Sequence, residues 1–244
     1  MAGDPWDALR AATAALDLGL PPDFEDQARA YLAALERWER IGRLTGYGSV
    51  ALRVRHLVVE SLMLLRAVPL PGAPLLDIGS GAGVPGLIVK LARPAWEVVL
   101  LEASGRRVNF LRDVSRRLGL AGITVAEGRA EALGTGPLAG RFQTVTMRAV
   151  TRGAAAGALA APFLGPAGVL VQALGAAPAP APGRGTVQEV TLAARGELPW
   201  GRRFLIIRRA DLEADVPRGT RRAAGAHHRG REPEGRRRQD HDGR

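Results

Sequence analysis

The first part of the chain alternates apolar and charged positions with the period of a helix. Asp4 followed by Pro5 predicts the start of a helix that continues to Gly19, because Asp is a preferred helix cap and Pro is tolerated in the first turn. A second helix is expected from Asp23 to Arg40. Its apolar positions recur every three or four residues and leave a charged outer face; they are Phe24, Ala28, Tyr31, Leu32, Leu35 and Trp38. A third amphipathic helix is expected from Ala51 to Arg66, before a linker rich in Pro and Gly at positions 69–74.

Short apolar runs alternate with helical segments from Leu75 onward. The runs predict strands at Leu75–Ile78, Glu97–Leu101, Ile123–Ala126, Thr144–Met147, Val169–Ala173, Val187–Leu192 and Phe204–Arg208. The segments between them predict helices at Pro85–Ala92, at Gly105–Leu118, from Glu131 onward and at Gly153–Phe163. This alternation is typical of an α/β fold with a mostly parallel sheet.

The pattern divides the chain into three regions. Residues 1–72 are expected to form an N-terminal helical extension, and residues 73–215 a Rossmann-like domain with a seven-stranded sheet. The segment Gly175–Gly185, rich in Ala, Pro and Gly, predicts a mobile loop between strands. Residues 216–244 are expected to be a basic, disordered tail.

Composition excludes several classes of protein and of functional site. It has no cysteine, which excludes disulfides and thiolate chemistry. It lacks an apolar run long enough to span a bilayer, and its N-terminal residues lack the features of a secretory signal, so a cytoplasmic location without membrane association is expected. No metal site is expected, because His227, His228 and His241 lie in the tail and only His56 lies elsewhere.

The net charge of +10 indicates an anionic partner such as a phosphate backbone. The tail contributes half of this charge, because nine arginines face four acids between Val216 and Arg244. Two interpretations stay open. In one, the tail is an RNA-binding arm. In the other, it is a product of gene overlap, since one allowed reading of GC-rich codons for Glu232–Arg244, shifted by one base, is a P-loop sequence.

A glycine-rich turn carries the first chemical signal. Leu75–Ile78 is an apolar strand that leads directly into Gly79, Ser80, Gly81 and Gly83, and a helix follows. Glycines allow close approach of the backbone to a ligand, and the following helix offers free amide donors. Such turns occur in many α/β proteins, so this one alone fits a dinucleotide site or a structural role equally well.

Three further positions follow the ends of predicted strands, where open α/β sheets bind ligands. Glu102 ends the next apolar run, about twenty residues after the turn, where an acid accepts the hydroxyls of a ribose. Glu131 follows the third strand, as a ligand contact or as an acid favoured by the helix dipole. Arg148 closes the fourth strand, as a functional residue or as a surface salt-bridge partner.

Four motifs together resemble one bacterial family, the ribosomal RNA small-subunit methyltransferase G, also called glucose-inhibited division protein B. They are Asp77–Leu87, Arg106–Leu111, Gly128–Glu131 and Arg148–Val150, and the resemblance covers roughly Trp6–Arg218. It implies a class I S-adenosylmethionine methyltransferase fold, with S-adenosylmethionine as the cofactor. It also implies N7 methylation of a guanine in 16S ribosomal RNA or in the small ribosomal subunit, by a monomer.

The resemblance implies a role for individual residues. The cofactor would be held by Asp77, Gly79, Ser80, Gly81, Gly83, Glu102, Ala130, Glu131 and Arg148. The RNA would be contacted by Arg148, His56, Arg106 and Arg107. No catalytic acid or base is assigned, because guanine N7 is already a nucleophilic lone pair and in-line positioning of the methyl group suffices.

Three segments depart from the pattern of this family. Its His-x-x-Asp-Ser-Leu appears as His56 followed by Glu60, Ser61 and Leu62, its Asn-Leu-Thr as Arg43–Thr45, and its Lys-Gly as Leu174–Gly175. A non-catalytic protein that binds S-adenosylmethionine or RNA is therefore one alternative.

An NAD-dependent oxidoreductase is the other alternative. It would share the glycine turn and Glu102 but would need a Tyr/Lys dyad or a positioned His. Tyr31 and Tyr47 precede the sheet, and Lys90 is the only lysine.

Overall fold

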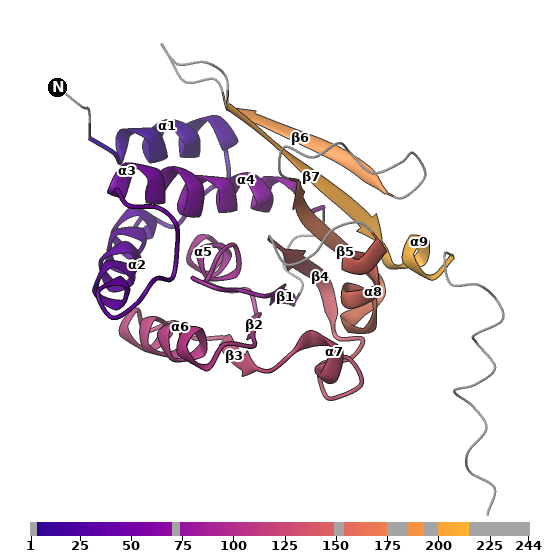
Figure 1. The fold of residues 1–244 in the computed structure, drawn as a ribbon. Coiled ribbons are helices and arrows are strands. Elements are labelled where there is room, and N and C mark those ends of the chain that lie inside the picture. The colour runs from indigo at the N-terminus through magenta and orange to yellow at the C-terminus, as the bar shows by residue number, and fades with distance from the viewer. Residues whose placement is uncertain (1–3, 70–73, 149–153, 175–184, 193–199, 215–244) are drawn as a thin grey trace, which may run out of the picture.

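A seven-stranded sheet runs through the middle of the protein, with strand order β3-β2-β1-β4-β5-β7-β6 (Figure 1). The computed structural model describes residues 4–69, 74–148, 154–174, 185–192 and 200–214. The strands are β1 (Leu75–Ile78), β2 (Val98–Glu102), β3 (Ile123–Glu127), β4 (Phe142–Met147), β5 (Leu164–Leu174), β6 (Thr186–Leu192) and β7 (Trp200–Arg208).

Strands β1 to β5 pair in parallel, whereas β7 is antiparallel to both of its neighbours, β5 and β6. The β6–β7 hairpin, inserted so that β7 lies next to β5, confirms the predicted class I methyltransferase fold. The strand order of this sheet differs from the order 3-2-1-4-5-6 of a dinucleotide-binding sheet. The topology therefore disfavours the oxidoreductase alternative.

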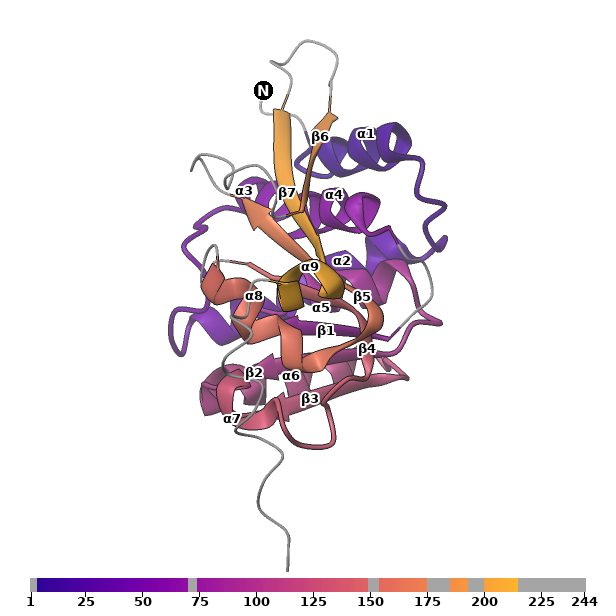
Figure 2. The same ribbon diagram turned by 90° about the vertical axis from the view of Figure 1, so that its right-hand side faces the viewer.

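Helices cover both faces of the sheet (Figures 1 and 2). They are α1 (Asp7–Leu16), α2 (Phe24–Glu39), α3 (Val50–Arg53), the π-helix η1 (Val54–Val59), α4 (Glu60–Ala67), α5 (Gly86–Ala92), α6 (Gly105–Arg117), α7 (Ala130–Leu133), α8 (Ala154–Ala160), the 3-10 helix η2 (Ala161–Phe163) and α9 (Arg209–Ala214). Helices α1 to α6 lie on one side of the sheet, and α7, α8 and α9 on the other.

Successive side chains of the central strands enter two different hydrophobic cores. Leu75 of β1 packs into the core under α1 to α6, whereas Leu76 packs into the core under α7 to α9. All residues of β1 and β2 are buried, as expected for parallel strands covered on both faces. Their ends are therefore fixed in position by packing from both sides.

The N-terminal helices share the first of these cores with the sheet. Tyr31 of α2 is fully buried against Phe110 of α6, with ring centroids 6.5 Å apart. Its hydroxyl donates a hydrogen bond of 2.8 Å to the carbonyl of Ala82, in the turn after β1. The helical extension therefore supports the glycine-rich turn directly.

The helix predicted from Ala51 to Arg66 contains a feature that periodicity did not predict. Its central turn, η1, is π-helical, and the amide of Glu60 donates to the carbonyl of Arg55 in place of the usual His56. The carbonyl of His56 instead accepts a hydrogen bond of 2.7 Å from Nη1 of Arg148. The π-turn thus joins this helix to the end of β4.

All seven predicted strands are confirmed, with differences at their ends. Strand β5 begins five residues before the predicted Val169, β7 begins four residues before the predicted Phe204, and α9 was not predicted. The helix predicted from Glu131 is a single turn. Some predicted segments lie outside the described residues: positions 175–184 of the predicted loop Gly175–Gly185, the linker residues 70–73, Gly153 and the tail at 216–244.

The Tyr31 hydroxyl is expected to stabilise the fold. Tyr31→Phe leaves the buried carbonyl of Ala82 without this donor, so the free energy of unfolding should fall by about 1–3 kcal/mol. Urea denaturation measures this change. Tyr47→Phe is a matched control, because the Tyr47 hydroxyl makes no hydrogen bond in the part of the chain that the structure describes. An equal loss in both variants would contradict the assignment.

Candidate functional site

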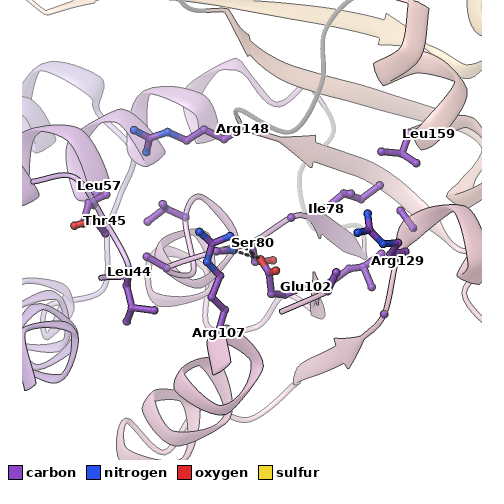
Figure 3. A pocket seen from close by; sticks show the side chains of 18 of the residues that line it. Leu44, Thr45, Leu57, Ile78, Ser80, Glu102, Arg107, Arg129, Arg148 and Leu159 are labelled. Atoms are coloured by element: carbon purple, nitrogen blue, oxygen red, sulfur yellow. Dashed lines mark hydrogen bonds and ion pairs between the residues drawn. The ribbon is translucent and has the colours of Figure 1, made fainter. Parts of the chain in front are cut away.

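A cavity of about 470 Å³ lies at the carboxyl ends of β1, β2, β3 and β4. Its walls include eight residues that the sequence singled out: Gly79, Ser80, Gly81, Glu102, Arg107, Ala130, Glu131 and Arg148. Four others do not line it: Asp77, Gly83, His56 and Arg106. In Figure 3, Arg148 lies on one side of the cavity, with Glu102 and Arg107 on the opposite side and Arg129 further along.

The glycine-rich turn forms one wall of the cavity. Gly79 and Gly81 have φ values of 71° and 58°, a region that glycine occupies without strain. The amide of Gly79 donates to the carbonyl of Leu101 at 2.8 Å, and the hydroxyl of Ser80 donates to the carbonyl of Asp77 at 2.9 Å. These bonds fix the turn against β1 and β2, so its backbone is ready to receive a ligand.

Asp77 lies behind this turn and holds it from beneath. Asp77 is 1% exposed, and its carboxylate accepts hydrogen bonds from the Gly86 amide at 3.0 Å and from the Thr146 hydroxyl at 2.8 Å. Burial raises the pKa of Asp77 to about 6. The structure places Asp77 as a support for the start of α5, and its predicted contact with a cofactor stays a prediction.

Glu102 is the acid that reaches the cavity. Its side chain is 6% exposed, and its two oxygens accept hydrogen bonds from the amides of Gly81 at 2.8 Å and Ser104 at 2.9 Å (Figure 3). Arg107 Nη1 lies 3.9 Å from Oε2 of the same carboxylate. One carboxylate therefore joins the ends of β1 and β2 and retains lone pairs for a further donor.

The segment after β3 forms the far wall. Ala130 is buried there, whereas Arg129 and Glu131 are exposed at the rim. Glu131 also lies in the first turn of α7, where an acid is favoured electrostatically. Both predicted roles of Glu131 are thus compatible with its position.

Arg148 lines the cavity and is also an ion-pair partner, so each of its two predicted roles has structural support. Its Nη2 lies 3.0 Å from Oε2 of Glu60, and its Nη1 donates to the carbonyl of His56. The other oxygen of Glu60 accepts from Nε of Arg202 in β7 at 2.8 Å and lies 2.8 Å from Nδ1 of His56. Glu60 therefore holds the neighbouring His56 and two arginines from distant parts of the chain at one side of the cavity.

His56 and Arg106 do not line the cavity, and each contacts the loop after α2 instead. The imidazole of His56 stacks on Tyr47, with ring centroids 4.7 Å apart and an interplanar angle of 14°. The guanidinium of Arg106 packs directly on Gly42, so that a side chain at Gly42 would collide with it. Arg106 thus connects α6 to the loop after α2.

Sequence reasoning missed the part of the cavity that this loop supplies. Leu44, Thr45, Gly46 and Tyr47 line the wall opposite the strands. The glycines of this segment and its departure from the family pattern at Arg43–Thr45 were the available signals. They did not show that the loop folds back over the strand ends.

The described ranges contain neither a membrane-spanning helix nor a cluster of metal ligands. No helix there is both long and apolar enough to cross a bilayer. No three His, Asp or Glu side chains in those ranges gather closely enough to hold a metal ion.

Comparison with known proteins gives consistent matches. A family model described as rRNA small subunit methyltransferase G matches residues 25–180. Ribosomal RNA small subunit methyltransferase G of Stenotrophomonas maltophilia (strain K279a) is 36% identical over 200 residues, which cover 78% of this chain and 91% of that protein. The protein of the same name from Lactobacillus delbrueckii subsp. bulgaricus (strain ATCC BAA-365 / Lb-18) is 38% identical over 137 residues, or 54% of this chain. This second match spans only 57% of the relative's length.

The solved structures that are similar to this chain have lower sequence identity to it than these relatives do. Precorrin-6y C5,15-methyltransferase from Geobacter metallireducens GS-15 is 15% identical, with a TM-score of 0.43, over 62% of this chain and 86% of that chain.

The buried Asp77 is expected to make stability depend on pH. Its folded pKa of about 6 lies above the ordinary Asp pKa of 3.8, so the folded state binds more protons between these values and the free energy of unfolding falls as pH rises. Asp77→Asn removes this charge, and Asn supplies both an acceptor for the Gly86 amide and a donor for Thr146. Relative to wild type, the variant should therefore gain up to about 3 kcal/mol between pH 4 and pH 7. Urea denaturation across this range tests it, and a constant difference between the two proteins would contradict it.

Proposed function

The chain belongs to the rRNA small subunit methyltransferase G family, and on this premise we propose that it transfers a methyl group from S-adenosylmethionine to guanine N7 of 16S ribosomal RNA. The observation that carries the proposal is the position of Glu102, a buried carboxylate that faces a cavity beside a glycine-rich turn. This arrangement suits a ligand with vicinal ribose hydroxyls.

The donor set around the cavity fits S-adenosylmethionine. Glu102 offers carboxylate oxygens to the ribose, and the turn at Gly79–Gly81 offers close backbone approach to the methionine part. Ile78, Leu101 and Ala130 are apolar lining residues that suit an adenine ring. Arg148 is a cation in reach of the cavity for a carboxylate or a phosphate.

The cofactor supplies an electrophilic methyl group when it is bound. The protein then has to hold guanine N7 in line with that group and to exclude water, because N7 carries no proton that must be removed. Correct positioning of the reactants alone lowers the activation free energy by several kcal/mol. The absence of an assigned general base is consistent with this chemistry.

Arginines at the rim support RNA as the substrate. Arg107 and Arg129 line the cavity and are exposed, and Arg43 is exposed on the loop that covers it. Contacts from such side chains to phosphates position a nucleic acid without reading its sequence. We also propose that the protein is a monomer that acts on small subunits in the cytoplasm.

The oxidoreductase alternative finds no support at the site. Lys90 is buried, and its ammonium donates to the carbonyls of Pro94 at 2.7 Å and Trp96 at 2.6 Å. It does not line the cavity.

Transfer of labelled methyl from S-adenosylmethionine to small ribosomal subunits that lack this modification tests the activity. We expect label at N7 of one guanine in 16S ribosomal RNA, identified by mapping of the product. Cofactor binding without transfer to any RNA would instead establish the non-catalytic alternative.

Glu102 is expected to determine cofactor affinity. Glu102→Ala removes the ribose acceptor and the anchor of the Gly81 amide, so the Kd for S-adenosylmethionine should rise at least tenfold, corresponding to about 1.4 kcal/mol. Isothermal titration calorimetry measures this. Glu127→Ala is the matched control, since Glu127 is the register partner of Glu102 on β3 but lies outside the cavity. Equal effects of the two substitutions would refute the role of Glu102.

A further inference from the structure

Tyr47 occupies a position in the cavity that the activity described above does not use. We infer that Tyr47 is the platform on which the target guanine stacks during methyl transfer. This inference rests on the proposed function and identifies a residue that positions its substrate.

Tyr47 is the only aromatic side chain among the described residues that line the cavity. One face of its ring is covered by the nearly parallel imidazole of His56, at a centroid distance of 4.7 Å. Only the other face and the edges of the ring are therefore available to the cavity. An aromatic face of this kind accepts a planar base, because base–aromatic stacking requires no particular hydrogen-bonding pattern.

The backbone of Tyr47 is fixed from both sides. The carbonyl of Tyr47 accepts a hydrogen bond of 2.9 Å from Nε of Arg53, and its amide donates to the hydroxyl of Thr45 at 3.3 Å. Glu39 in turn accepts from both the amide and the hydroxyl of Thr45, at 3.0 and 2.6 Å, and forms an ion pair with Arg53. The loop that carries Tyr47 is thus ordered before a substrate arrives, which lowers the entropic cost of binding.

The ring of Tyr47 is also supported from behind. His56, on which it rests, is held through Nδ1 by Glu60, and Glu60 also binds Arg148. Arg148 lines the same cavity, so Glu60 fixes both the support of the aromatic platform and a neighbouring cation. A base that stacks on Tyr47 would lie beside a guanidinium that is able to contact its phosphate.

Enzymes that modify a base read it outside its helical stack, between aromatic or apolar side chains. Thr45 and Leu57 also line this part of the cavity, and the Tyr47 hydroxyl makes no hydrogen bond in the described part of the chain. The hydroxyl is therefore available to an edge of the base. The cavity thus combines a stacking surface with a polar group at its margin.

Substitutions at position 47 separate stacking from a purely structural role. Methyl transfer to small ribosomal subunits should keep its kcat/KM within about threefold in Tyr47→Phe and Tyr47→Trp, which retain an aromatic face. It should fall roughly 5- to 150-fold in Tyr47→Leu, the range expected for the loss of one stacked base. The Kd for S-adenosylmethionine and the urea midpoint should stay unchanged in all three. Ile41→Ala is the control, because Ile41 is exposed on the same loop and does not line the cavity.

A spectroscopic measurement tests stacking without methyl transfer. The chain has two tyrosines, so isotopic labelling of tyrosine rings gives two sets of resonances, with the fully buried Tyr31 as an internal reference. Titration of the S-adenosylhomocysteine-bound protein with guanosine 5′-monophosphate should shift the ring resonances of Tyr47 upfield and leave those of Tyr31 in place. Cytidine 5′-monophosphate, with its smaller ring, should produce a smaller shift.

The two measurements distinguish failure of this inference from failure of the proposed function. Shifted Tyr47 resonances in a protein that methylates no RNA would support the platform and overturn the activity. Active wild type with equal kcat/KM in Tyr47→Leu and Tyr47→Phe, or with unmoved Tyr47 resonances, would overturn the platform and leave the activity in place.

Discussion

Burial of β1 and β2 on both faces is the constraint on which the site depends. Because helices pack on each side of these strands, a one-residue shift in register would move each side chain into the opposite core and disrupt the packing on both faces. Their carboxyl ends therefore meet at a fixed place, and the glycine-rich turn and Glu102 lie beside each other there. The N-terminal helices contribute to the same constraint, since Tyr31 connects α2 to the turn.

Two carboxylates near this place differ in their surroundings and in their roles. Asp77 is enclosed behind the turn, where its environment opposes ionisation and its oxygens are used by Gly86 and Thr146. Glu102 borders the cavity and accepts hydrogen bonds from the backbone amides of Gly81 and Ser104. The same residue class thus supplies a structural support in one case and a ligand acceptor in the other.

The sequence predicted the parts of the fold and site that depend on local patterns. The alternation of apolar runs located every strand, and Glu102 and Arg148 were found because each ends such a run. The contacts that place Tyr47 at the cavity are short in range, whereas Glu60 binds Arg148 and Arg202 from distant parts of the chain. Both sets depend on side-chain packing that no period encodes. The π-turn is a similar case, because the residues of Val54–Val59 are equally compatible with an α-helix. Its presence became apparent only from the hydrogen bond between Glu60 and Arg55.

The shared carboxylate of Glu60 also has an evolutionary consequence. Its oxygens bind His56 of the preceding helical turn, Arg148 directly after β4, and Arg202 of β7. A shorter acid at position 60 could not reach all three partners without a change in the helix that carries it. Among homologous chains, substitutions at these four positions and changes to the π-turn are therefore expected to occur together and not one at a time.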